Sequence, residues 1–373
     1  MKFTIDASVL ANLLQDLSKA IPAKTAQPIL TNYLLELAGE LLRVTASDSE
    51  IVLRGCVKLD ETDATGSSAV PAKLLLDLVK TLPAGPVTIE KTLNGSVDIR
   101  WKSGTSSLPV FDPADYIKVT VPKKDEAKTF DTTTDILVKA IGKTLFAVSA
   151  DQTRPALGGI FFDIMPGVSR LVASDSLKLV CFDIKTPAVT EAASFILPAK
   201  AASILKGILP KEQPVKVVFD RKNARFAFGS TEMTARLVDA KFSKYAGVIP
   251  TENENILVLG RDELMNILKR MSVVADRKQA FVNVKLSFNK ASITAEDIGM
   301  STKGAEEIEC DYDGTDIAVL LKAPTVIDVL SVTEADKVEV KIKDGTKAIL
   351  IQPAESERAE DPYMAIVMPF RPK

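Results

Sequence analysis

The chain has 373 residues with a formal net charge of −2, and it is 46% hydrophobic and 26% charged, as is ordinary for a globular protein. It contains no histidine, which removes the usual general base near pH 7 and the commonest metal ligand. No apolar run approaches the roughly 18 residues that a membrane-spanning helix needs, so the composition argues against a membrane protein and against histidine-dependent catalysis.

The first third of the chain predicts a helix, short strands, a second helix and further strands. Apolar residues after Asp6 recur at the spacing of one helix face, and Asp6 is the predicted N-cap. Alternating segments then predict strands, because every second residue is apolar. The predicted helices cover 6–21 and 71–82, and the predicted strands cover 34–37, 41–45, 87–90 and 96–101.

The same order of predicted helices and strands occurs twice more along the chain. Leu10, Leu137 and Leu264 hold the same place in three predicted helices, about 125 residues apart, which is a spacing of whole domains rather than of solenoid units. The string V-T-A-S-D-S, with Asp48, returns as L-V-A-S-D-S with Asp175. A weaker third copy is I-T-A-E-D-I. The remaining predicted helices cover 133–149, 198–209, 260–275 and 321–331; the strands cover 160–164, 171–173, 215–219, 225–228, 282–288, 292–295, 338–342 and 348–351.

This repetition predicts an α+β fold of three tandem similar domains, each with two helices packed on antiparallel sheet. We expect the domains at 1–122, 123–249 and 250–373. Their boundaries fall in two polar segments that contain proline, V-P-K-K-D-E-A-K-T at Val121–Thr129 and P-T-E-N-E-N at Pro250–Asn255.

The six predicted helices carry more basic than acidic residues, although the chain as a whole is slightly acidic. Lysines that merely solvate helix faces would explain this for any one helix. The bias extends over all three copies, however, so a surface that faces a polyanion is an equal alternative.

Chemical motifs are absent. Gly142-Lys143-Thr144 resembles the end of a phosphate-binding loop, but that loop needs a glycine where Leu137 stands, and the segment is predicted to lie within a helix. The aspartates of the S-D-S strings occur once per repeat, which indicates turns rather than a metal site. We therefore predict no enzyme activity, no cofactor and no metal.

Cysteine usage and the first residues indicate the compartment. Cys56, Cys181 and Cys310 are odd in number and far apart, which suits free thiols in a reducing environment. The opening M-K-F-T-I-D carries an acidic residue where a signal peptide would be apolar. The expected location is the cytoplasm.

Five strings in a fixed order resemble one family. They are M-K-F-T-I at the start, Q-P-I-L-T-N-Y-L-L at Gln27–Leu35, R-P-A-L-G-G-I-F-F at Arg154–Phe162, A-S-D-S-L-K-L at Ala173–Leu179 and I-V-M-P-F-R-P at Ile366–Pro372. Together with the three-domain length, they make the whole chain similar to the DNA polymerase III beta subunits, the bacterial sliding clamps. The DNA clamp fold is thereby implied.

The resemblance implies a ring-shaped, head-to-tail homodimer that encircles duplex DNA without reading its sequence. It also implies that short linear motifs of the DNA polymerase III alpha subunit, the clamp loader and repair proteins bind the ring. Retention by topology needs only weak attraction to phosphates. The residues implied to face DNA are Lys24, Lys73, Lys80, Lys139, Lys143, Arg154, Lys200, Lys206 and Arg270.

The family's peptide-binding groove can be carried over position by position. It falls on Leu157, Ser174, Ser176, Leu177, Lys178, Leu179, Ser243, Gly247, Val248, Ala348, Ile366, Val367, Met368, Pro369, Phe370 and Arg371. Without the resemblance, Ile366–Phe370 is equally well explained as a buried C-terminal strand. The chain departs from the family at Ser176-Leu177-Lys178 and at Ser243 and Gly247, which predicts a more apolar groove with one charge-assisted donor fewer.

The dimer interface is implied to join Leu108 and Val110 of one chain to Val273 and Val274 of the other. Both stretches are apolar with polar neighbours, as an interface with a charged rim should be. Two alternatives remain at this point. One is a cytoplasmic three-domain scaffold without DNA binding, and the other is an enzyme whose carboxylates are not recognised. A divergent or phage-encoded clamp is also open.

Overall fold

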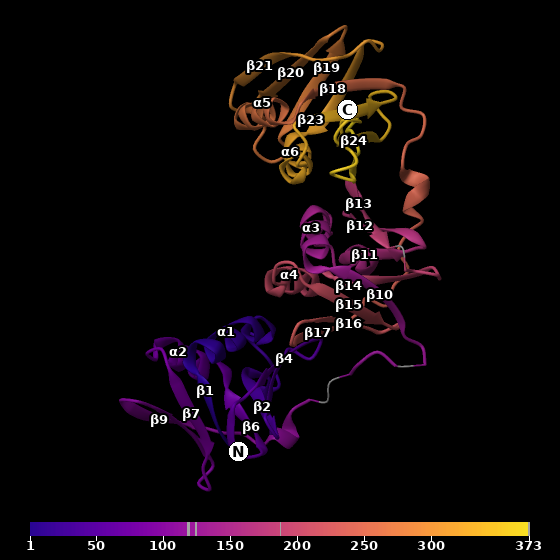
Figure 1. Ribbon diagram of the computed structural model, residues 1–373. Coiled ribbons are helices and arrows are strands. Elements are labelled where there is room, and N and C mark those ends of the chain that lie inside the picture. The colour runs from indigo at the N-terminus through magenta and orange to yellow at the C-terminus, as the bar shows by residue number, and fades with distance from the viewer. Residues whose placement is uncertain (118–119, 124, 187, 372–373) are drawn as a thin grey trace. The chain divides into compact units, whose positions relative to one another are not determined.

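The computed structural model of the chain describes residues 1–117, 120–123, 125–186 and 188–371 (Figure 1). Lys124 of the predicted linker and Pro372 of the C-terminal string lie outside the described residues. The chain packs as two compact units, Met1–Asp135 with Ser203–Leu237, and Ile136–Ala202 with Val238–Lys373. None of the described helices is long and apolar enough to cross a membrane.

The threefold order of elements predicted from the sequence is present. Each copy begins with a strand and a helix, continues with a group of strands, and ends with a second helix and three strands. The first copy contains β1 (Lys2–Asp6), α1 (Ala7–Leu17), β2 (Asn32–Ala38), β3 (Leu41–Ser47), β4 (Ile51–Lys58), β5 (Glu61–Ala64), β6 (Gly66–Pro71), α2 (Ala72–Thr81), β7 (Pro86–Lys91), β8 (Ser96–Trp101) and β9 (Gly104–Pro109).

Within the described residues, the second and third copies repeat this order with one strand fewer. The second contains β10 (Lys128–Thr133), α3 (Thr134–Thr144), β11 (Gly159–Ile164), β12 (Gly167–Ser174), β13 (Lys178–Thr186), β14 (Ala193–Pro198), α4 (Ala199–Ile208), β15 (Pro214–Phe219), β16 (Asn223–Phe228) and β17 (Thr231–Arg236). The third contains β18 (Asn255–Gly260), α5 (Arg261–Val274), β19 (Phe281–Ser287), β20 (Lys290–Asp297), β21 (Thr302–Glu309), β22 (Ile317–Lys322), α6 (Ala323–Val332), β23 (Lys337–Ile342), β24 (Ile349–Pro353) and β25 (Tyr363–Val367).

The helix starts differ in their capping. Asp6 is the N-cap of α1, as predicted, and its carboxylate accepts from the N–H groups of Ser8 and Val9. Asp135 and Asp262 lie inside the first turns of α3 and α5, where a negative charge favours the positive end of the helix dipole. The apolar stripe of each helix faces the core: in α1, Leu10, Leu14 and Leu17 are fully buried.

In the described residues, the strands form four antiparallel sheets, and two of these sheets contain strands from two successive sequence copies. One eight-stranded sheet has the order β10-β15-β16-β17-β4-β3-β2-β6, and the other has the order β14-β11-β12-β13-β25-β24-β23-β18. The joining pairs are β17 with β4 and β13 with β25. The smaller sheets are β5-β1-β7-β8-β9 and β21-β20-β19-β22, so β9 and β21 are edge strands.

Helices cover the sheets in pairs. In the first unit α1 packs beside α2, and in the second α5 packs beside α6 (Figure 1). These pairs bury their apolar faces and leave lysines of the opposite faces, such as Lys73 and Lys80 of α2, exposed to solvent.

Candidate functional site

The turn between β12 and β13 is fixed by its own side chains. Asp175 accepts hydrogen bonds from the N–H groups of Leu177 and Lys178, both at 2.9 Å, and Ser174 Oγ donates to the Lys178 carbonyl at 2.8 Å. Ser176 has a φ of 80°, a left-handed conformation that serine adopts only when its surroundings impose it. The S-D-S string therefore makes a turn, as the sequence predicts.

Charge interactions also stabilise the turn between β12 and β13. Burial disfavours the Asp175 carboxylate, but hydrogen bonds from the Lys178 ammonium, at 2.7 Å, and from two backbone N–H groups outweigh it. The pKa of Asp175 therefore lies below its usual value. Lys178 Nζ also lies 5.8 Å from the centre of the Phe146 ring. Its charge is thus satisfied within the protein.

The C-terminal strand comes to the same turn. β13 pairs with β25 so that Leu179 lies opposite Ile366, and the N–H of Met368 donates to the Leu177 carbonyl at 2.9 Å. A pocket of about 290 Å³ opens there, which we call the β12–β13 pocket. Leu157, Ser174, Ser176, Leu177, Lys178, Leu179, Phe242, Ser243, Tyr245, Val248, Ile366 and Met368 line it.

The floor of the β12–β13 pocket is apolar. Leu179, Phe242 and Ile366 belong to a buried cluster with Val172, Cys181, Ile196 and Leu350. Burial raises the pKa of the Cys181 thiol to about 12, so this thiol is an apolar component of the floor. Leu177, Val248 and Met368 stay exposed above it. Such a pocket suits apolar side chains of a short extended peptide.

Ten of the predicted groove residues line this pocket and six do not. Val367 is buried on the opposite face of its strand from Ile366, because neighbouring strand residues alternate in direction. Phe370 lies instead against Phe281, with ring centres 4.6 Å apart, in a separate pocket of about 840 Å³. The other four that do not line it are Gly247, Ala348, Pro369 and Arg371.

The explanation of Ile366–Phe370 as a buried strand is correct for its first two residues only. β25 ends at Val367, and both Ile366 and Val367 are fully buried strand residues. Ile366 nevertheless lines the pocket, and Met368 lies beyond the strand and is exposed. Core and pocket therefore share one strand.

Phe242 and Tyr245 line the pocket but were absent from the prediction. Phe242 stacks on Phe161 with ring centres 4.7 Å apart, and Tyr245 donates to Asp163 Oδ2 at 2.7 Å. Burial and the Asp163 carboxylate raise the pKa of Tyr245 well above its usual value, so the hydroxyl stays protonated as a donor. The available signal was two aromatic residues in the polar segment after β17.

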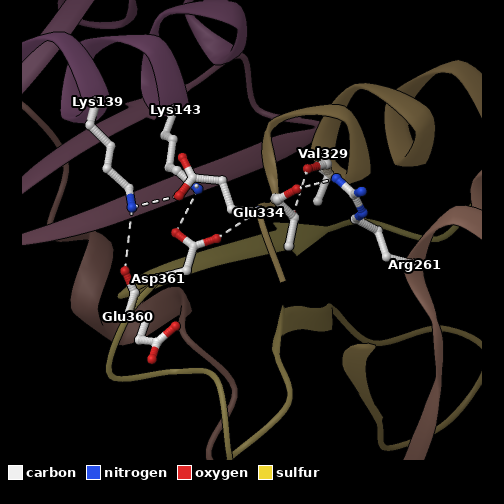
Figure 2. A network of polar contacts seen from close by, with 8 residues as sticks. Lys139, Lys143, Arg261, Val329, Glu334, Glu360 and Asp361 are labelled. Atoms are coloured by element: carbon white, nitrogen blue, oxygen red, sulfur yellow. Dashed lines mark hydrogen bonds and ion pairs between the residues drawn. The ribbon is translucent and has the colours of Figure 1, made fainter. Parts of the chain in front are cut away.

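Lys143 was predicted to face DNA, and the structure contradicts this. Its side chain is buried, with a relative exposure of 3%, and Nζ lies 2.6 Å from Asp361 Oδ1 and 3.5 Å from Glu334 Oε1 (Figure 2). The rings of Phe182 and Tyr363 flank it, with centres 6.0 and 5.5 Å from Nζ. A charge that is buried and paired in this way cannot reach a phosphate.

A network around Lys143 ties α3 to the segments before β23 and β25 (Figure 2). Lys139 Nζ lies 2.6 Å from Glu334 Oε2 and donates to the Glu360 carbonyl at 3.3 Å. The Glu334 N–H donates to Asp361 Oδ2 at 2.9 Å. Burial opposes ionisation of Glu334, but Lys139 and Lys143 together keep its pKa below the usual value. Lys139 is thus half-buried and already paired.

Arg154, which is also predicted to face DNA, lies beside the turn between β12 and β13. Its guanidinium donates to Ser176 Oγ at 2.5 Å and to Asp151 Oδ2 at 2.8 Å, so it lies at the rim of the β12–β13 pocket. Arg270 makes two hydrogen bonds to the Glu306 carboxylate, at 2.8 and 2.5 Å. Lys24, Lys73, Lys80, Lys200 and Lys206 are exposed.

The predicted interface residues lie in two places, at edge strand β9 and at the end of α5 beside edge strand β21. Leu108 belongs to edge strand β9, and Val110 follows it, both half-buried. Val273, near the end of α5, has a relative exposure of 81%, which is unusual for a valine. Its neighbour Val274 lies beside Gly304 of edge strand β21, and the Val274 carbonyl accepts from Thr302 at 2.8 Å.

Nothing in the described part of the chain forms a metal centre: no group of three or more cysteine, aspartate or glutamate side chains there is placed to hold an ion.

Comparison with known proteins gives full-length similarity. Three family models match in order: DNA polymerase III beta subunit, N-terminal domain, at residues 1–120; its central domain at 131–244; and its C-terminal domain at 246–370. The beta sliding clamp of Vibrio cholerae is 29% identical over 381 residues, with both chains fully covered.

Solved structures agree in fold. The DNA polymerase III subunit beta of Pseudomonas aeruginosa is 25% identical with a TM-score of 0.94, and both chains are fully covered. The beta subunit of Thermotoga maritima is 25% identical with a TM-score of 0.90, again over the whole of both chains.

Proposed function

This chain belongs to the DNA polymerase III beta subunit family, the sliding clamps, and we propose that two copies close head to tail into a ring around duplex DNA and hold the replicative polymerase there. The observation that carries the proposal is the threefold repeat of one two-helix unit along the whole chain. The proposed domains are 1–122, 123–249 and 250–373. The protein is a binding scaffold and not an enzyme, and its proposed location is the cytoplasm, where a bacterium keeps its DNA.

The proposed DNA contacts are made by exposed helix and loop lysines. Lys73 and Lys80 of α2 and Lys200 and Lys206 of α4 project from helix bodies, and Lys24 follows α1 in a loop. Ammonium groups on flexible stems exchange readily between phosphates, which suits sliding. Lys139 and Arg270 contribute by exchanging their present carboxylate partners for phosphate.

The proposed peptide site is the β12–β13 pocket. Its apolar floor, with Leu177, Val248 and Met368 exposed above it, would accept the bulky residues of a linear motif from the polymerase, the clamp loader or a repair protein. Lys178 is paired with Asp175, so apolar contact rather than a free cation supplies the affinity.

The proposed ring closes where β9 of one chain meets β21 of the other. Each has one side that pairs with no other strand of the described residues, and such an edge strand pairs readily with another chain. Val273 and Val274 at one edge and Leu108 and Val110 at the other would supply the apolar contact.

The experiment that tests closure is the double substitution V273E/V274E. We expect folded monomers by light scattering at concentrations where the natural chain is dimeric, because two charges would be buried without partners. The matched control is Val9→Glu, an exposed valine of α1 outside the proposed interface. A double variant that stays dimeric would place the interface elsewhere.

A further inference from the structure

The turn that borders the β12–β13 pocket has a structural twin between β3 and β4. Ser49 has a φ of 80°, equal to that of Ser176. Asp48 accepts from the N–H groups of Glu50, at 3.0 Å, and Ile51, at 2.7 Å, and Ser47 Oγ donates to the Ile51 carbonyl at 3.0 Å. These are the hydrogen bonds of the β12–β13 turn, made by the first copy of the S-D-S string.

The strand that pairs beside each turn is also equivalent in the two copies: it is β17 beside the β3–β4 turn and β25 beside the β12–β13 turn. β4 pairs with β17 so that Val52 lies opposite Thr234, as Leu179 lies opposite Ile366. The Arg236 N–H donates to the Glu50 carbonyl at 2.8 Å, which matches the bond from Met368 to Leu177. The strand pairing therefore shows which positions are equivalent. Glu50 is equivalent to Leu177, Thr234 to Ile366, and Arg236 to Met368.

A second pocket opens at this turn, with a volume of about 250 Å³, and we call it the β3–β4 pocket. It is lined by Ser49, Glu50, Val52, Thr234 and Arg236, which are the counterparts of β12–β13 pocket residues, and by Lys222 and Asn223 of the adjacent hairpin, among others. The backbone is repeated, but the lining has changed from apolar to polar.

Two polar side chains of the pocket can form hydrogen bonds with a ligand. Asn223 and Thr234 have relative exposures of 8% and 4% and both line the pocket. Neither side chain makes a hydrogen bond to another described residue, and neither contributes an atom to the polar atoms that are shut off from solvent without a partner, so a ligand in the pocket can reach them. A ligand that supplies both donors and acceptors would satisfy them.

The charges favour an anion. Lys222 and Arg236 line the pocket against one acid, Glu50, whose carboxylate lies 3.3 Å from the Arg236 guanidinium. Both partners of this ion pair are more than half exposed, and exposed pairs are weak. An incoming carboxylate can therefore replace Glu50 on Arg236, where a guanidinium offers two parallel donors.

We propose that the β3–β4 pocket is a second peptide site, which takes a carboxylate side chain of an extended acidic segment. Its volume lies below the range of about 300–1,000 Å³ typical of small-molecule sites and fits one or two side chains. The proposal goes beyond the clamp function and does not require that the β12–β13 pocket bind peptides. One fold would thus offer two peptide sites with opposite preferences.

The test uses the full-length protein and a fluorescein-labelled octapeptide of alternating serine and glutamate, followed by anisotropy. We expect binding that R236M weakens by about tenfold or more, because a hydrogen bond between charged groups is worth about one such factor. E50Q should strengthen binding, since it frees Arg236. The matched control R221M removes an exposed cation of the same hairpin that does not line the pocket, and it should change affinity far less.

Four outcomes would overturn the proposal. They are no measurable binding of the octapeptide, equal weakening by R221M and R236M, no gain with E50Q, or equal affinity for the version with glutamine in place of glutamate. If a short DNA duplex displaces the octapeptide and loses affinity with R236M, the pocket binds phosphate and the peptide assignment is wrong. Failure of V273E/V274E to yield monomers would leave these results unaffected, so the two proposals can fail separately.

Discussion

The β3–β4 and β12–β13 pockets share the hydrogen bonds of their turns and the pairing of their strands, but they differ in the side chains that line them. The first is lined by Glu50, Thr234 and Arg236, and the second by Leu177, Ile366 and Met368. Elsewhere on β13 and β25, Lys143 is buried near the rings of Phe182 and Tyr363 and paired with Asp361, whereas the equivalent position of α1 is Asp16, which is exposed. The repeated S-D-S string thus preserves the backbone geometry of the turn, while a few side-chain changes alter the polarity of the pocket beside it.

The largest expected effect comes from breaking the buried pair. K143M should lower the free energy of unfolding by about 3–5 kcal/mol, because it leaves Asp361 buried without its cation. The matched change at the equivalent position, D16N, should stay within about 0.5 kcal/mol, since Asp16 is exposed. Urea denaturation of both variants makes the comparison, and K143M/D361L should regain much of the loss. Equal stability of K143M and D16N would contradict the role of the network.

A smaller effect, on peptide affinity, is expected when residues lining the β12–β13 pocket are replaced by their counterparts from the β3–β4 pocket. L177E and M368R place at the β12–β13 pocket the residues of its counterpart, and both sites are exposed enough to accept them without unfolding. Each removes an apolar contact worth about 1.5–3 kcal/mol, so calorimetry should show at least tenfold weaker binding of a glutamine-leucine-x-leucine-phenylalanine peptide. R236M, in the other pocket, should leave this affinity unchanged. If R236M weakens it equally, the two pockets are not independent.

The smallest effect is expected on the free energy of unfolding when Asp175, in the turn between β12 and β13, is replaced. The folded-state pKa of Asp175 is lowered, so its contribution to stability is present above the unfolded value of about 3.9 and is lost as the pH falls through the folded value. D175N should therefore be less stable than the natural chain by about 1 kcal/mol at pH 7, and the gap should close toward pH 3. Denaturation midpoints at the two pH values measure this gap. A gap that widens in acid would reverse the assigned sign.

Much of the fold was predictable because periodicity is local. The helices at Leu10, Leu137 and Leu264 and the hairpins that follow them lie where apolar spacing and turn residues indicate. The S-D-S strings were correctly assigned to turns. The pairing of β17 with β4 and of β13 with β25 was not predicted, because nothing local in either strand specifies a partner in another sequence copy.

The candidate sites were predicted less completely, for the same reason. Lys143 looks in the sequence like the other helix lysines, and its burial depends on Glu334 and Asp361, which lie about 200 residues further on. Arg154 lies beside Ser176 through a contact of the same non-local kind. The family resemblance located the turn and strand of the β12–β13 pocket but not its aromatic wall, Phe242 and Tyr245.

If a closed ring of two chains encircles DNA, its retention should differ between circular and linear duplexes. On linear duplex, binding should weaken steeply with salt, because each phosphate contact releases counterions with a slope of about −0.9 per neutralised charge. Once loaded by a clamp loader on a closed circle, the protein should survive salt that strips it from linear DNA, and cutting the circle should release it. The measurement is the fraction that co-elutes with each DNA form in gel filtration at rising salt. If salt removes the protein equally from circular and linear DNA, the protein binds DNA by ordinary electrostatic attraction, which would contradict a ring that encircles the duplex.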